Sequence, residues 1–391
     1  MIGPTLVAIS LIAFFMSIHV PQDPALSLAT IRGVDPNDVS EKIYDDAYRE
    51  LGMHRPDFYF SVTPHNYPAT TNKYSSSIVR DKVKDLLKSG IPHDAIAVDN
   101  EIVSVSDNTL VNKKNGYPFF PKLHWNGSKN RYHLWLSSFF SGTFGISVIS
   151  RQPVKPLVWK AFQWTATLSI IAILFTFIFG IGFAILLSNN PDSRRNKFLS
   201  QFLYLIYAVP IFWLATMLVM YLTTDSYSSA FNIFPSVGID VFIGESTFNQ
   251  ILGNAKRFIL PVICASLSSI AYVARVLRRS ILDEMQEPYI TTALSKGLSE
   301  KQAMMRHAFP NALLPLITII VGSIPATLGG AVVIEVIFNI PGVGRLLYNA
   351  IGIGDWNIAF CIIIIVGFIT IISYLIGDLL YTMANPKIRF A

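Results

Sequence analysis

Charged side chains are scarce in this 391-residue sequence. They make up 14% of the residues, whereas 52% of the residues are hydrophobic. A soluble domain would carry about a quarter charged residues. The apolar residues are also gathered into long blocks, which excludes an ordinary soluble globular protein. The composition therefore predicts an integral membrane protein.

Cysteine and metal-binding patterns are nearly absent. The two cysteines, Cys264 and Cys361, both fall inside apolar blocks, which argues against a disulfide framework and against a cysteine-based metal site. Five of the seven histidines lie between the first two blocks, at spacings that match no metal motif. We therefore expect no metal site. These histidines are His54, His65, His93, His124 and His133.

Catalytic motifs are absent too. The dipeptide Gly-Lys occurs nowhere, so the phosphate-binding loop that ends in Gly-Lys-Ser/Thr is excluded. Neither Gly-x-Ser-x-Gly nor His-Glu-x-x-His is present. We expect no catalytic residue and no enzyme activity in this chain.

The apolar blocks predict six membrane spans, because a bilayer core needs about 20 apolar residues per helix. Charge-free runs occur at 1–18, 161–187, 198–223, 258–274, 308–334 and 356–377. The first run has no basic stretch before it and no small-residue cleavage site. We interpret it as an uncleaved first span and not as a signal peptide.

Basic residues in the short loops predict the orientation, because cytoplasmic loops carry an excess of Lys and Arg. With a cytoplasmic N-terminus, only Lys256, Arg257 and Arg345 lie in short outer loops. Both termini are then cytoplasmic, and the net charge of +6 gives no reason to expect a nucleic-acid partner. The basic residues on the inner side are Arg194, Arg195, Lys197, Arg275, Arg278, Arg279, Lys296, Lys301, Arg306, Lys387 and Arg389.

The chain divides into a first transmembrane helix (1–19), a long extracytoplasmic segment (20–158) and a five-helix core (159–391) with a cytoplasmic loop at 281–309. Within the outer segment we predict helices at Ser40–Leu51 and Ser77–Leu87 and a strand or hairpin at Ala95–Val105. We interpret six aromatic residues as the core of this segment: Tyr117, Phe119, Phe120, Trp125, Tyr132 and Trp135.

The cytoplasmic loop is polar and basic, and Gly297 interrupts two helix-prone pieces at roughly 281–295 and 299–309. Glycine permits a backbone turn that other residues disfavour, and it lets a partner backbone come near. Ala293, four residues earlier, would give the first helix a face with only a small side chain. Two short helices joined in this way can insert into a cleft on another protein. The alternative is a solvated basic loop.

The loop contains Tyr289-Ile290, Ala293, Lys296-Gly297-Leu298-Ser299, Arg306-His307-Ala308 and Asn311-Ala312-Leu313-Leu314-Pro315. It resembles the loop by which permease subunits of binding-protein-dependent ABC importers grip their ATPase, in the variant of the peptide and nickel importers. The family's general Glu-Ala-Ala-x-x-x-Gly motif is matched only at Ala293 and Gly297. The resemblance implies ATPase-coupling roles for Tyr289, Ala293, Lys296, Gly297, Leu298, Arg306 and His307.

Other segments share the resemblance and point to a B-type permease of a dipeptide, oligopeptide or nickel importer. The stretch 59–130 has no family counterpart, so we interpret it as an insertion. Family members usually begin with a basic cytoplasmic stretch, so the resemblance leaves open whether the true start lies upstream of Met1. The similar segments are His19–Pro24, Gly142–Ser147, Ala274–Glu284, Val333–Phe338, Ile340–Leu347, Asp378–Tyr381 and Asn385–Arg389.

The resemblance implies an all-α bundle of about six transmembrane helices, the type I ABC importer permease fold, in a bacterial inner membrane. It implies two ABC ATPase subunits that carry ATP and magnesium, a second homologous permease, an extracytoplasmic substrate-binding protein and membrane lipid as partners. No cofactor is expected on this chain. The expected function is translocation of di- or oligopeptides.

Three ionisable residues at the edges of spans, Glu335, Asp378 and Arg275, are candidates for a pathway or gating role. The alternative is that they only anchor helix ends by snorkelling. Three rival functions stay open. The cargo could be nickel or another small solute, or residues 20–158 could form a membrane-anchored sensor or enzyme. A self-powered secondary transporter is disfavoured, because we see no inverted repeat and no buried mid-span carboxylate.

Overall fold

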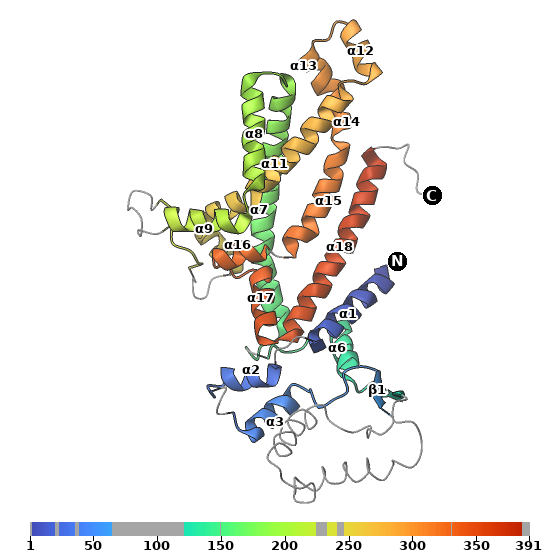
Figure 1. Cartoon of the computed structure of the whole chain (residues 1–391), viewed down its shortest axis with the longest axis vertical. Helices are drawn as coiled ribbons and strands as arrows, with labels where there is room; N and C mark the ends of the chain where they lie inside the picture. The colour runs from blue at the N-terminus through green and yellow to red at the C-terminus, as the bar shows by residue number, and fades with distance from the viewer. Residues whose placement is uncertain are drawn as a thin grey trace, which may run out of the picture. The chain divides into compact units, whose positions relative to one another are not determined.

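The computed structural model describes residues 2–19, 23–35, 39–64, 121–148, 150–223, 233–240, 246–329 and 331–384 (Figure 1). Three helices in these ranges are long and apolar enough to cross a membrane singly: α7 (Val154–Asn189), α11 (Ile259–Glu284) and α18 (Trp356–Ala384). Counting three bent helix pairs as one span each brings the number in the described ranges to six. The chain forms two compact units, which we describe separately.

In the first unit (Met1–Ala13, Val154–Gly352 and Ile358–Ala391), α7, α8 (Arg194–Ala208) and α11 lie side by side (Figure 1). Small residues allow the close approach of α7 and α11. A Cβ atom built on Gly180 would lie only 2.7 Å from Val273 Cγ1. Glycine at such a position lets two membrane helices come into backbone contact.

Two of the predicted spans are not continuous helices. The span predicted at 198–223 bends by 93° between α8 and α9 (Ile211–Leu222), where Pro210 precedes α9. The span predicted at 308–334 bends by 46° at Leu313, between α14 (Phe309–Ala312) and α15 (Leu314–Leu328). Proline removes a backbone donor and ends or kinks a helix. Hydropathy counts each of these stretches as one span and does not report the bend.

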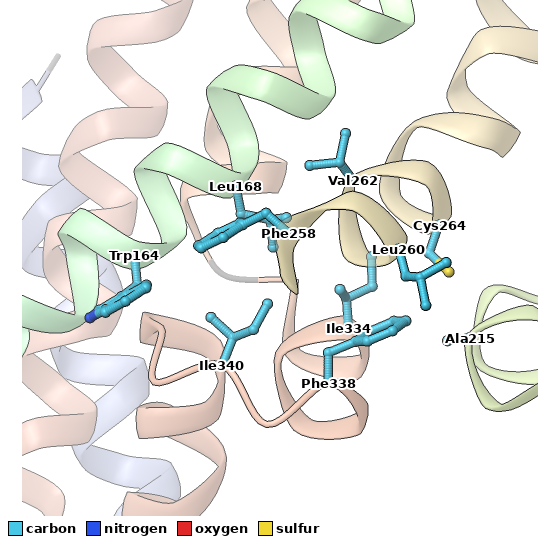
Figure 2. Close-up of a cluster of buried hydrophobic side chains, with 10 residues drawn as sticks. All are labelled: Trp164, Leu168, Ala215, Phe258, Leu260, Val262, Cys264, Ile334, Phe338 and Ile340. Atoms are coloured by element: carbon cyan, nitrogen blue, oxygen red, sulfur yellow. The ribbon is translucent and has the colours of Figure 1, made fainter. Parts of the chain in front are cut away.

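A buried apolar cluster joins α7 to α9, to the start of α11 and to α16 (Val332–Ile337) (Figure 2). Trp164 of α7 stacks on Phe258, with ring centroids 5.9 Å apart and planes within 3°. Ile334 and Phe338 pack from α16 and its C-terminal end. The cluster therefore fixes α16 against α7. Two short helices complete this side of the unit: α10 (Thr247–Gly253) and the 3₁₀ turn Ala255–Phe258.

The second unit comprises Phe14–Pro153 and Ile353–Asn357. Its helices α2 (Pro24–Ile31) and α3 (Glu41–Glu50) pack through Ala25, Leu28, Ala47 and Tyr48. The Ser40 hydroxyl caps α3 by accepting a hydrogen bond from the Ile43 amide. The helix predicted at Ser40–Leu51 is therefore confirmed.

Two strands, β1 (Phe60–Pro64) and β2 (Pro121–Trp125), pair antiparallel in this unit and precede α6 (Arg131–Phe140). Tyr132 and Trp135 of α6 are buried among aromatic rings, as predicted. The prediction for Trp125 was wrong, because its side chain is 66% exposed on β2. The elements predicted at 77–87 and 95–105, and Tyr117, Phe119 and Phe120, lie outside the described residues.

The residues between α17 (Val343–Ile353) and α18 belong to this second unit. The Asp355 carboxylate, which is fully buried, accepts hydrogen bonds from Ser147 Oγ at 2.7 Å and from the Val148 amide at 3.0 Å. Asn357 Nδ2 donates to the Ile146 carbonyl at 2.9 Å. These bonds tie the start of the last helix to residues 146–148.

Candidate functional site

The loop around Gly297 folds as a pair of short helices at one end of α11 and α15 (Figure 1). Helix α12 (Pro288–Ser295) leads into the turn, and α13 (Glu300–Ala303) continues through a π-helical turn (Met304–Ala308) into α14. Ile290 of α12 packs against Ala303 and Ala308, with Met285 at the edge of this contact. The two arms therefore form one body with its own small core.

Gly297 makes the sharp turn between the arms. Its φ is +88°, a left-handed conformation that costs an L-residue about 1–2 kcal/mol. The Gly297 amide donates to the Leu294 carbonyl at 2.9 Å, and the Leu298 amide donates to the Ala293 carbonyl at 3.4 Å. This is the Schellman pattern that ends a helix. A Cβ atom at Gly297 would meet no atom of this chain within 4 Å, so the glycine faces open space.

A capping box starts the second arm. The Ser299 hydroxyl accepts from the Gln302 amide, and Gln302 Oε1 accepts from the Ser299 amide. The start of α13 is thus capped by side chains of the loop itself, and the end of α12 is closed by the backbone bonds at Gly297. The loop keeps its shape without a partner, which suits a rigid docking element.

The predicted coupling residues play different parts in this body. Lys296, Arg306 and His307 are exposed, and Leu298 is half-buried. Ala293 is buried, so it does not present the small-sided outer face that the sequence suggested. The Tyr289 hydroxyl donates to the Glu284 carboxylate and accepts from Asn311 Nδ2 at 3.0 Å. Tyr289 therefore ties the loop to the ends of α11 and α14.

Glu335 on α16 is fully buried and sits at the start of α17. Its Oε1 accepts a hydrogen bond from Thr165 Oγ1 at 2.8 Å, and its Oε2 accepts one from the Arg345 amide at 2.9 Å. Thr165 Oγ1 in turn accepts from the Val343 amide at 2.8 Å. One carboxylate therefore joins α7, α16 and the first turn of α17, where a helix favours negative charge.

Two glycines make room for this carboxylate. A Cβ atom on Gly342 would lie 2.4 Å from Glu335 Cδ, and one on Gly344 would lie 2.9 Å from the Val332 backbone. Burial raises the pKa of Glu335, and the hydrogen bonds from Arg345 and Thr165 oppose that rise. Snorkelling to the membrane surface is excluded for this residue, because its side chain contacts no solvent.

Asp378 and Arg275 do not join Glu335 in the described structure. The Asp378 side chain is exposed on α18. The Arg275 guanidinium lies over three tyrosine rings, at 4.6 Å from the Tyr207 centroid and 5.7 Å from those of Tyr204 and Tyr272. The three candidates thus occupy separate environments, and a pathway role for Arg275 or Asp378 stays a prediction.

A groove of about 420 Å³ runs between α7, α11 and α15. Its described lining is apolar except for hydroxyl groups, and it contains no carboxylate, imidazole, thiol, Lys or Arg side chain. The hydroxyl groups come from Ser169, Thr176, Ser269, Tyr272, Thr318, Ser323 and Thr327. The sequence does not predict this groove, because its residues come from three helices far apart in the chain.

Residues 180–390 match the family model described as "Binding-protein-dependent transport system inner membrane component". The chain belongs to this family. Curated relatives of this inner membrane component include an oligopeptide transport system permease protein of Bacillus subtilis, AppB, which is 30% identical over 66% of this chain and 80% of its own length. A putative peptide transport system permease protein of Brucella abortus is 33% identical over 66% of this chain and 78% of its own length.

Among solved structures, a chain of the MetNI methionine ABC transporter in inward facing conformations is 13% identical, with a TM-score of 0.45 over 59% of this chain and 96% of that chain. Similarity at that level supports no detailed comparison. The family membership itself confirms the predicted permease family and its all-α type I importer fold.

Two features of this inner membrane component escaped the sequence analysis. The short outer loop predicted to hold Arg345 contains the helix α17. The sequence does contain the apolar spacing of this helix, because Val343 and Ala350 lie seven residues apart and form its buried face. Thr165, the partner of Glu335, carried no signal, because nothing in a single sequence links residues 170 positions apart.

Proposed function

We propose that this chain is the permease subunit of an ATP-driven ABC importer that translocates di- or oligopeptides. The self-contained helical body around Gly297 is the observation that carries the proposal. It exposes basic side chains and a left-handed glycine with free space beside it. The names of these two relatives, oligopeptide and peptide transport system permease proteins, support peptides as cargo.

The proposed mechanism is alternating access. Closure of two ATPase subunits on bound ATP and magnesium would push on residues 289–307, and this force would reach the bundle through α11 and α14. Helix α12 is joined to α11 through the Tyr289–Glu284 hydrogen bond, so a displaced loop pulls on the end of a long helix. The chain itself is not an enzyme in this proposal, because ATP is hydrolysed on the partner subunits.

The groove between α7, α11 and α15 is this chain's proposed share of the pathway. A second, homologous permease would complete it, and an extracytoplasmic substrate-binding protein would deliver the cargo. Hydroxyl groups on an apolar wall can exchange hydrogen bonds with a peptide backbone without holding it through charge. Both termini are cytoplasmic in this arrangement.

Nickel is the second candidate cargo, and the groove argues against it. Imidazole, thiolate and carboxylate are the usual protein ligands of such metals, and the described lining of the groove contains none of them. A bare nickel ion would therefore meet none of these ligands along the described wall.

Two experiments test the proposal. Affinity purification of the chain from its native membrane in mild detergent, with mass spectrometry, should recover one or two P-loop ATPases and a second permease. Recovery of the chain alone, from a preparation that keeps other complexes intact, would refute the importer assignment. Uptake of labelled tripeptide and of ⁶³Ni²⁺ by the reconstituted complex then decides the cargo, and ATP-dependent uptake of nickel alone would refute the peptide assignment.

A further inference from the structure

A small basic pocket lies on the first unit between α7, α8 and α11, away from the groove. Its floor consists of Leu187, Leu203 and Ala271, which pack together in a buried cluster. Its walls carry the hydroxyl-bearing residues Ser200, Tyr204 and Tyr207 of α8 and the guanidinium groups of Arg275 and Arg278 of α11. Every wall residue offers hydrogen-bond donors.

Neither arginine has an anionic partner in the described part of the chain, where no carboxylate oxygen lies within 4.0 Å of either guanidinium. The Nε atom of Arg278 is buried and has no hydrogen-bond acceptor. A buried donor without an acceptor is costly, especially on a charged group. Such a donor in a pocket of positive charge is suited to an anionic acceptor.

The tyrosine rings do not satisfy these arginines. Tyr204, Tyr207 and Tyr272 lie against the Arg275 guanidinium, with the guanidinium carbon 4.6–5.7 Å from the ring centroids. Ring faces attract the cation but offer no acceptor to its five N–H groups. The rings therefore hold the guanidinium in place and leave its hydrogen-bonding capacity for a ligand.

The charge and size of the pocket suit one oxygen of a phosphate group. The cavity volume is about 20 Å³, room for a single oxygen-sized group, so most of any ligand stays outside on the protein surface. Arginine pairs with phosphate oxygens through parallel hydrogen bonds. Arg275 is 16 residues after Ile259, about 24 Å along α11 at 1.5 Å per residue. A hydrocarbon core of about 30 Å places Arg275 and Arg278 near the level of the headgroups.

We propose that Ser200, Tyr204, Tyr207, Arg275 and Arg278 form a binding site for the phosphate of an anionic phospholipid headgroup. The proposed orientation puts the site in the cytoplasmic leaflet, where basic pockets between transmembrane helices bind anionic lipids. Tyr204 and Tyr207 are 49% and 45% exposed, so a lipid in the surrounding bilayer reaches the pocket directly. A bound headgroup would join α8 to α11.

The test measures the lipid that the purified full-length chain retains. Native mass spectrometry in mild detergent, after addition of equal amounts of phosphatidylglycerol and phosphatidylcholine, should show preferential retention of phosphatidylglycerol. Arg278→Gln and Arg275→Gln should each lower that retention at least fivefold. Arg279→Gln is the matched control, because Arg279 is exposed and pairs with Asp283 outside the pocket. Equal retention in all four proteins would overturn the proposal.

A second measurement keeps the test decisive if an arginine variant fails to fold. Phosphatidylglycerol should raise the apparent melting temperature of the wild-type chain more than phosphatidylcholine does. Tyr207→Phe, which keeps the ring under Arg275 and removes only the hydroxyl, should reduce that difference. An equal rise with inorganic phosphate alone would assign the site to free phosphate and overturn the lipid assignment. No rise with either would overturn the site itself.

Discussion

Replacement of Glu335 by alanine should loosen the start of α17. The change removes the acceptor of the Thr165 hydroxyl and of the Arg345 amide, both inside the protein. Each buried donor left without an acceptor costs about 1–3 kcal/mol. Two such donors give a destabilisation on the order of 2–6 kcal/mol, at the high end of single substitutions. Glu335→Gln keeps the volume and one acceptor oxygen, so its expected cost is below about 1.5 kcal/mol.

The assay is the apparent melting temperature of the purified chain in detergent, read beside uptake by the reconstituted complex. Asp378→Asn serves as the control, because the Asp378 side chain is exposed and its change should cost less than about 0.5 kcal/mol. If Glu335→Ala has the same apparent melting temperature as this control, the claim that the carboxylate holds α17 is refuted.

The same residue gives a pH dependence with a definite sign. Burial raises the pKa of Glu335 in the folded chain above its ordinary value of 4.5, so the folded state holds this proton more tightly than the unfolded state does. Stability relative to Glu335→Gln should therefore be greatest below pH 4.5 and should fall as the pH rises through the higher folded-state pKa. A difference that grows with pH would contradict the burial argument.

Three further predictions concern glycines and the second unit. Gly297→Val should abolish co-purification of the ATPase without affecting membrane insertion, because φ of +88° is strained for a β-branched residue. Gly297→Asn should recover part of the co-purification, because asparagine tolerates this φ. Normal uptake by the valine variant would refute a coupling function of this loop. Gly180→Leu should lower the melting temperature by overpacking against Val273, at a cost of about 1–3 kcal/mol. Asp355→Ala should speed limited proteolysis near Ser147, whereas an exposed control, Asp378→Asn, should not.

The parts of this fold that the sequence predicts are those set by neighbouring residues. The helix at Ser40–Leu51 follows from a serine cap and a four-residue apolar spacing, and the spans follow from composition. The 93° bend after Ala208 follows from Pro210, but hydropathy averages over that residue and reports one span. The exposure of Trp125 depends on which face of the β1–β2 pair is covered. That depends on tertiary packing, which composition does not predict.

The candidate site divides in the same way. The coupling loop is local: Gly297, the Ser299 capping box and the contact of Ile290 with Ala303 all lie within 15 residues, so the sequence predicted two short helices joined at a glycine. Glu335 is not local. Its charge marked it as a candidate, but its function as the cap of α17 depends on Thr165 of another helix, and the buried cluster around Trp164 brings that helix near.

The local and non-local elements also differ in how a substitution can be rescued. A change at Gly297 acts through one backbone conformation, so any residue that tolerates a left-handed φ should restore the turn. A change at Glu335 affects a buried space that Gly342 and Gly344 leave open for one carboxylate. A Cβ atom at either glycine would collide with that carboxylate or with α16. No single second substitution supplies both the acceptor oxygens and the space. Suppressors of Gly297 variants should therefore map to position 297 or to the partner, and suppressors of Glu335→Ala should be rare within this chain.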